Sequence, residues 1–172
     1  MFKWILAAVA LVLLAAFVRW QRAAVKTSFV NGLAPYGALP GKEYIFERDC
    51  YIFKFRKTAW WKPSVDTDQP LVGDHDVVPV LPANVSAANI GADIPGVRIL
   101  DIVRVGDRAR IASVRRDESR TGTTITFELF FVNDEQRKYP RIDAFWIMDH
   151  TPEQRGEAPL LRPEYAVERA RD

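Results

Sequence analysis

Apolar and polar positions alternate most clearly between residues 97 and 149. Four runs there have the composition of strands, at residues 97–105, 108–116, 123–132 and 141–149. In the third run, one face carries Ile125, Phe127, Leu129 and Phe131. This period of two is typical of a half-buried strand. Gly106-Asp107 favours a tight hairpin turn, and the short connections predict an antiparallel meander.

Two more strands are expected at residues 43–47 and 50–56, which are rich in Tyr, Ile and Phe. About six antiparallel strands usually curl into a small barrel or sandwich, because this protects the sheet edges. In outline the meander resembles SH3-like and OB-like barrels, a likeness of fold that implies no function. We therefore expect a mainly β domain over residues 42–150, with a long Pro-rich loop at residues 58–96.

The segments on either side of this domain have a different composition. Residues 27–41 contain Gly and Pro without a sustained period, which predicts a linker. Residues 151–172 form a polar tail. A short C-terminal helix at residues 163–171 is expected there, because Pro163 suits the first helical position.

The N-terminus carries an apolar run from Trp4 to Val18. Trp4 and Trp20 bracket this run as interfacial aromatic residues would, and Lys3 and Arg19 could extend to the lipid headgroups. Small residues are poorly placed for signal-peptide cleavage. The pattern predicts an uncleaved signal-anchor helix over residues 4–20 within a membrane anchor at residues 1–26, and a cleaved signal peptide is the alternative.

This prediction implies a single-pass membrane protein, located in the inner membrane if the source is bacterial. More basic residues follow the apolar run than precede it, so the positive-inside rule favours a cytoplasmic β domain by a small margin. The sequence leaves the side of the membrane open.

Charge and composition exclude some classes of protein. The basic residues around the apolar run are Lys3, Arg19, Arg22 and Lys26. Removing these four from the 24 basic residues leaves 20, against 22 acidic residues, so the remainder is slightly acidic. That balance argues against a general nucleic-acid binder. With 1 cysteine the chain cannot form an internal disulfide.

Signals for catalysis and for metal binding are weak, and no cofactor is expected. Cys50 opens an apolar strand, where a buried, inert thiol is the common arrangement. Asp74, His75 and Asp76 are adjacent ligand-type residues, but their spacing matches no strong metal signature, and a solvated loop explains them more simply.

Two groups of residues are candidates for contact with a partner. Trp60 and Trp61 are adjacent, so one of them is expected to be exposed, and exposed aromatic residues are enriched at binding surfaces. Arg108 and Arg110 share one face of a strand and could form a basic strip. Neutralisation of these arginines by nearby acidic residues is the simpler interpretation.

The sequence therefore favours a membrane-anchored accessory protein whose β domain binds another protein. The first alternative is a small metal- or thiol-dependent enzyme that uses Asp74, His75 and Asp76 or Cys50. The second is a module that senses anionic lipid through its arginine strip.

Overall fold

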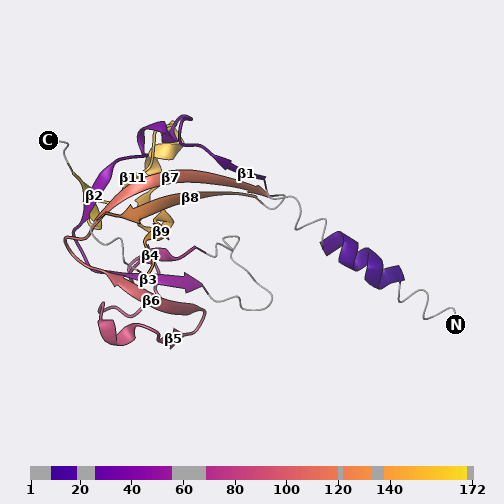
Figure 1. The fold of residues 1–172 in the computed structure, drawn as a ribbon, viewed down its shortest axis with the longest axis horizontal. Helices are drawn as coiled ribbons and strands as arrows, with labels where there is room; N and C mark the ends of the chain where they lie inside the picture. Colours follow the sequence, from indigo (N-terminus) through magenta and orange to yellow (C-terminus); the bar gives the residue numbers. More distant parts are fainter. Residues whose placement is uncertain (1–8, 19–25, 56–68, 120–121, 133–137, 170–172) are drawn as a thin grey trace.

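The computed structural model describes residues 9–18, 26–55, 69–119, 122–132 and 138–169, and it is mainly β, as predicted (Figure 1). The strands are β1 (Lys26–Phe29), β2 (Glu43–Phe46), β3 (Cys50–Phe55), β4 (Leu71–Gly73), β5 (Asp93–Ile94), β6 (Val97–Val103), β7 (Arg108–Ser119), β8 (Gly122–Phe131), β9 (Arg141–Asp143), β10 (Met148–Asp149), β11 (Leu160–Leu161) and β12 (Ala166–Glu168). Short 3-10 helices are η1 (Tyr36–Ala38), η2 (Ala87–Asn89), η3 (Phe145–Ile147) and η4 (Thr151–Arg155).

The long hairpin of β7 and β8 is the largest strand pair in the described residues. Its register runs from Ala109 opposite Phe131 to Ser119 opposite Gly122, with a bulge between Ile111 and Ser113. Alternate side chains of both strands are buried, as the period of two predicted. The bulge lets the hairpin bend, so its two strands can follow the curve of the sheet.

A 10-stranded mixed sheet contains this hairpin. Its order is β12-β2-β7-β8-β9-β4-β3-β6-β5, and β1 also pairs with β7. All pairs are antiparallel except β4 with β9, which is parallel. The strand path is open, because its two ends at β12 and β5 are not paired with each other in the described part of the chain. The predicted closed antiparallel barrel or two-sheet sandwich is therefore wrong.

The predicted meander is wrong at its first turn, after residues 97–105, which is not a hairpin; the turns after β7 and β8 do join antiparallel neighbours, as predicted. β6 pairs with β3 and β5, whereas β7 pairs with β8, β2 and β1. β2 and β3, which follow one another along the chain, likewise belong to different parts of the sheet. The turns at residues 47–49 and 104–107 are thus arches that carry the chain between the two halves of the sheet, which lie one above the other in Figure 1.

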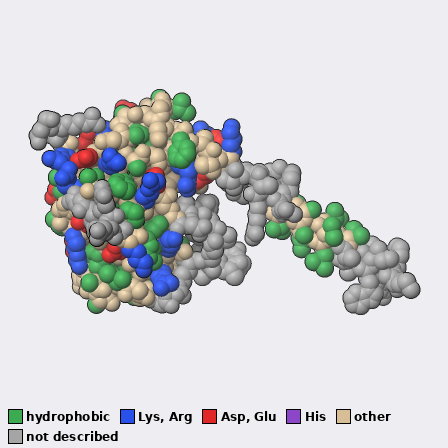
Figure 2. All heavy atoms as spheres, viewed as in Figure 1, with side chains coloured by type: hydrophobic (Ala, Val, Ile, Leu, Met, Phe, Trp, Pro, Cys, Tyr) green, Lys and Arg blue, Asp and Glu red, His purple; other side chains and the backbone are tan. Residues whose placement is uncertain are grey.

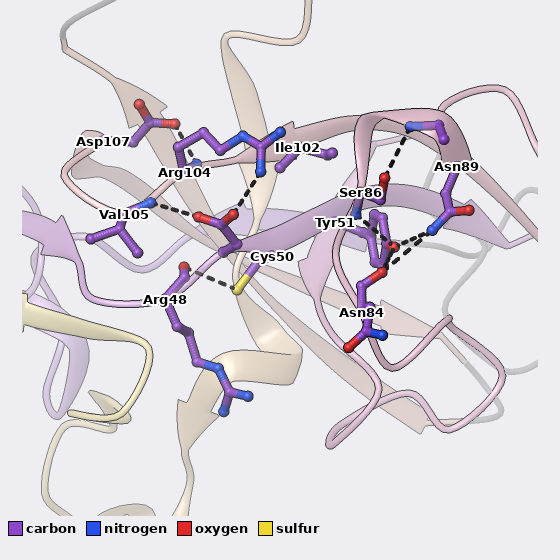
Figure 3. Close-up of polar contacts among 12 residues, drawn as sticks. Arg48, Cys50, Tyr51, Asn84, Ser86, Asn89, Ile102, Arg104, Val105 and Asp107 are labelled. Atoms are coloured by element: carbon purple, nitrogen blue, oxygen red, sulfur yellow. Dashed lines mark hydrogen bonds and ion pairs between the residues drawn. The ribbon is translucent and has the colours of Figure 1, made fainter.

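Asp49 and Gly106 hold these two arches side by side. The Asp49 carboxylate accepts hydrogen bonds from the Val105 amide at 2.9 Å and from the Arg104 guanidinium at 2.6 Å, as the dashed lines in Figure 3 show. These bonds hold the pKa of Asp49 below its usual value. Gly106 has φ of 88°, a conformation that favours glycine, and its amide donates to the Phe46 carbonyl at 2.8 Å.

Folding the sheet over on itself produces an inner core between the halves. Phe46, Ile52, Phe127 and Leu129 are among its fully buried side chains. A smaller outer core covers the opposite face of β3, β4 and β6 and includes Tyr51, Phe53 and Leu71. β3 therefore contributes to both cores with alternate side chains, which explains why its sequence is apolar almost throughout.

Tyr51 anchors the loop that covers the outer core. Its hydroxyl donates to the Asn84 carbonyl at 2.7 Å and accepts from the Asn89 side chain at 2.6 Å and the Ser86 amide at 3.2 Å (Figure 3). The hydroxyl of a fully buried tyrosine needs such partners, because an unpaired one would be costly.

The apolar N-terminal segment is helical at residues 9–18, where most of its apolar side chains are exposed (Figures 1 and 2). Within the described residues no helix is both long and apolar enough to cross a bilayer. The predicted transmembrane helix over residues 4–20 and the single-pass membrane localisation are therefore wrong.

The C-terminal residues form strands. Residues 163–165 are a turn, and β12 pairs with β2 where a short helix was predicted, so that helix is wrong. Tyr165 is buried in the inner core, and β11 pairs with β10. Burial of Tyr165 gives this segment more stabilisation than an isolated turn of helix would have in water.

Asp49→Ala is expected to lower the free energy of unfolding by about 1–3 kcal/mol, because the Val105 amide and the Arg104 side chain lose their shared acceptor. Chemical denaturation of the two proteins measures this difference. Glu157→Ala, which removes an exposed carboxylate paired only with Arg155, is the matched control and should have little effect. Equal effects of the two substitutions would show that Asp49 does not hold the arches.

Candidate functional site

The three residues that were weak candidates for metal binding are engaged in other contacts. The Arg48 guanidinium forms ion pairs with Asp74 at 2.9 Å and Asp76 at 3.0 Å. His75 turns toward the Leu81 carbonyl, which lies 2.7 Å from its Nδ1 atom. No group of three or more potential metal ligands occurs among the residues that the structure describes. The structure therefore gives Asp74, His75 and Asp76 no shared ligand position.

Asp74 instead joins the end of β4 to the C-terminal segment. It is 3% exposed, and its Oδ1 atom accepts from the Tyr165 hydroxyl at 2.8 Å and from the Asp76 amide at 3.0 Å. The Arg48 guanidinium lies 5.0 Å from the centre of the Tyr165 ring. Burial, together with the bond to Asp74, raises the pKa of Tyr165. This cluster has the properties of a structural joint, because each of its polar groups has a partner.

Cys50 has the surroundings of an inert thiol. Its side chain is fully buried at the start of β3, and its Sγ atom lies 3.8 Å from the Arg48 carbonyl oxygen. Burial first, and then the charge of Asp74, raise the pKa of this thiol. Because the thiolate is the nucleophilic form, these surroundings suppress its reactivity.

Arg108 and Arg110 lie on the outer face of the sheet, opposite the inner core. Direct cross-strand partners share a face, and the register places Glu43, Arg110, Phe130 and Arg141 in one row across β2, β7, β8 and β9. A second row contains Val167, Ile45 and Arg108. We call the residues of these two rows the basic face.

The two candidate arginines differ in whether a carboxylate forms an ion pair with them. Arg108 pairs with Glu43 at 2.9 Å, and this bond lowers the pKa of Glu43. Arg110 is exposed, and its guanidinium lies 5.4 Å from the centre of the Phe130 ring. Among the described residues, no carboxylate forms an ion pair with Arg110. A guanidinium held over an aromatic ring keeps its outward donors available for another molecule.

The other candidate pair, Trp60 and Trp61, lies outside the described residues. Its predicted role in partner binding stays a prediction. Arg108 and Arg110 are therefore the predicted partner-binding candidates that the structure describes.

Asp143 was not identified as a candidate from the sequence, although its carboxyl group is fully buried and its pKa is raised. It is fully buried at the end of β9, and its Oδ1 atom accepts from the amides of Phe127 at 3.1 Å and Phe145 at 3.0 Å. Its Oδ2 atom has no hydrogen-bond partner in the described residues. Burial outweighs the two hydrogen bonds and raises the pKa of Asp143 to about 6. An acid inside the apolar run at residues 141–149 was the available signal.

The chain has no significant match to a protein-family model, a curated protein or a solved structure. Neither these comparisons nor the described side chains indicate an enzyme.

Replacing Asp143 with Asn should change how stability depends on pH. A carboxyl group whose pKa is raised to about 6 in the folded state keeps a proton that the unfolded state loses at lower pH. Stability is thus favoured at low pH and falls as pH rises through 6, by about 3 kcal/mol. Asn carries no such proton, so the stability of D143N relative to the natural chain should rise by this amount between pH 4 and 7.

Denaturation of both proteins at several pH values measures this difference, and the contributions of all other groups cancel in the comparison. Glu157→Gln, at an exposed carboxylate, is the control and should show no pH-dependent difference. A constant difference between D143N and the natural chain would contradict the raised pKa.

Cys50 should react with a thiol reagent at pH 8 only after the chain unfolds, because its burial excludes the reagent and disfavours the thiolate. The reaction is followed by absorbance with and without denaturant. Glu157→Cys combined with Cys50→Ser supplies an exposed thiol as the control and should react at once. Rapid labelling of Cys50 in the folded chain would restore the thiol-enzyme hypothesis.

Proposed function

We propose that this protein is an accessory binding module that takes up an acidic segment of a partner protein on its basic face. The observation that carries the proposal is Arg110, which is exposed, stacked on Phe130 and not ion-paired with any carboxylate among the described residues. Arginine and aromatic side chains are the residues most enriched at the energetic centres of protein interfaces.

Charge on the basic face supports an acidic partner. Arg108 and Arg141 accompany Arg110 on the basic face. Beside this face, Arg169 pairs with Glu43, and Glu128 pairs with Arg141, so the carboxylates that neutralise these arginines are Glu43 and Glu128. Four arginines thus share two glutamates, which leaves a positive surplus. A positive surface both attracts an acidic partner and discriminates against a basic one.

Apolar contacts support a protein partner over a small anion. Val167 is 39% exposed, and Ile45 and Phe130 are partly exposed beside the arginines. Together they give the face a mixture of apolar and cationic groups, which suits a peptide that carries aromatic residues among its acids. The lipid-sensing alternative uses the same arginines but makes no use of these apolar side chains.

The proposal predicts that Arg110→Ala weakens binding of acidic, aromatic-containing peptides about tenfold, because the stacked guanidinium is lost. Fluorescence anisotropy with a labelled peptide set measures the affinity. Arg98→Ala is the matched control, since Arg98 is an exposed strand arginine on β6, away from the basic face. Arg110→Lys should weaken binding by less, because it keeps the charge and loses only the planar group.

Equal losses for R110A and R98A would show that binding is general electrostatic attraction and would overturn the proposal. Equal affinity for matched peptides with Gln in place of Glu would also overturn it. Vesicles of phosphatidylserine are the counter-probe, and binding to these vesicles with no peptide binding would replace the protein partner with a lipid.

A further inference from the structure

Three buried polar atoms near the junction of β4, β8 and β9 have no hydrogen bond among the residues that the structure describes. They are Oγ1 of Thr126, Oδ2 of Asp143 and Nε2 of Gln69. The Thr126 side chain is 1% exposed, and Asp143 is fully buried. A buried polar atom without a partner is costly, so a group of them calls for a physical explanation.

Thr126 and Asp143 are neighbours on one face of adjacent strands. Asp143 lies directly opposite Glu128, and Thr126 is two residues from Glu128 along β8. The Oδ1 atom of Asp143 accepts from the amide of Phe127 at 3.1 Å, so the carboxyl group extends toward the Thr126 end of this pair. The charge of Arg115, which is opposite Thr126 on β7, also acts on Asp143. Diagonal neighbours of this kind are within reach of one another across a sheet.

Gln69 approaches Asp143 from the start of β4. The Asp143 amide donates to the carbonyl of Pro70 at 2.7 Å, and Leu71 is opposite Asp143 in the parallel pair. A residue that precedes proline favours an extended backbone, so Gln69 lies on the same side of the chain as Leu71. That side is the one on which Asp143 lies, and Gln69 is therefore the third neighbour.

The three atoms require a partner that can both donate and accept. Nε2 of Gln69 is a donor, Oδ2 of an ionised Asp143 is an acceptor, and the Thr126 hydroxyl can be either. They do not bond to one another. A water molecule has two donors and two acceptors, and buried waters in proteins typically make about three hydrogen bonds to groups that are otherwise unpaired.

We propose that Thr126, Asp143 and Gln69 bind one internal water molecule, which accepts from Gln69 and donates to Asp143 and Thr126. The water joins the start of β4 to β8 and β9, beyond the contact that the strands make through their backbones. When Asp143 is protonated, the same water accepts from its carboxyl group, so the three side chains stay paired in both forms. This site is independent of the function proposed for the basic face.

Replacement of Thr126 with Val tests the site through the sign of the effect. Val has nearly the shape of Thr but no hydroxyl. If the hydroxyl bonds to a bound water, that water loses a partner in T126V, and the urea midpoint of unfolding is expected to fall by on the order of 1 M. If the hydroxyl has no partner, T126V removes an unpaired buried group, and an unchanged or raised midpoint would overturn the proposal.

Thr124→Val is the matched control for this substitution. Thr124 lies on the same strand and on the same face as Thr126, but it is partly exposed, so solvent reaches its hydroxyl. T124V is therefore expected to change the midpoint little. An equal fall in T124V and T126V would show a general cost of Val on this strand, and the proposal would fail.

A high-resolution crystal structure of the natural chain locates the water directly, and it decides the case in which T126V folds poorly. One ordered water is expected within about 3.2 Å of Oγ1 of Thr126, Oδ2 of Asp143 and Nε2 of Gln69. A direct hydrogen bond between Thr126 and Asp143, with no water between them, would overturn the proposal.

Discussion

The pair of adjacent arches between the halves of the sheet is the constraint on which the rest of this structure depends. Asp49 supplies one carboxylate to the Val105 amide and the Arg104 side chain, so the turn after β2 and the turn after β6 are held together. Both turns carry the chain from one half of the sheet to the other at the same place. The inner faces of β7 and β8 therefore lie over those of β3 and β4. The inner core is the result, and the outer face of β7 becomes available for binding.

Strand positions could be predicted from the sequence, and so could the pairing of β8 with β7 and with β9, but the partners of β2, β3 and β6 could not. The alternation in β8 locates a strand correctly because it reports burial of one face, which is a local property. The same alternation on both sides of Gly106-Asp107 is compatible with a hairpin and with an arch, since both reverse the chain. In the arch, the amide of Val105 donates to Asp49, which is 56 residues away along the chain, so the local pattern does not report this bond.

Some of the candidate site residues could likewise be identified from the sequence, and others could not. Arg108 and Arg110 could be identified by their shared strand face, whereas Phe130 and Val167 join them only through the register of neighbouring strands. Asp74, His75 and Asp76 were weak candidates for metal binding, and in the structure Arg48 forms ion pairs with the two carboxylates. The three residues are adjacent in the sequence, but the two aspartates form their ion pairs with a residue that is distant along the chain.

Asp74 and Asp143 are buried carboxylates that follow the same kind of turn but have different partners. β4 and β9 are parallel, so their carboxyl ends lie at the same edge of the sheet. The chain leaves each strand by a turn in which the aspartate accepts from the amide two residues later: Asp76 for Asp74, and Phe145 for Asp143. Asp74 also has Arg48 and Tyr165, whereas Asp143 has only backbone donors in the described residues, with its Oδ2 atom unpartnered. A buried carboxylate without a cationic partner holds its proton more readily. The same kind of turn therefore holds Asp74 in a network of side-chain contacts beside β4. Beside β9 it holds Asp143, whose pKa is raised to about 6.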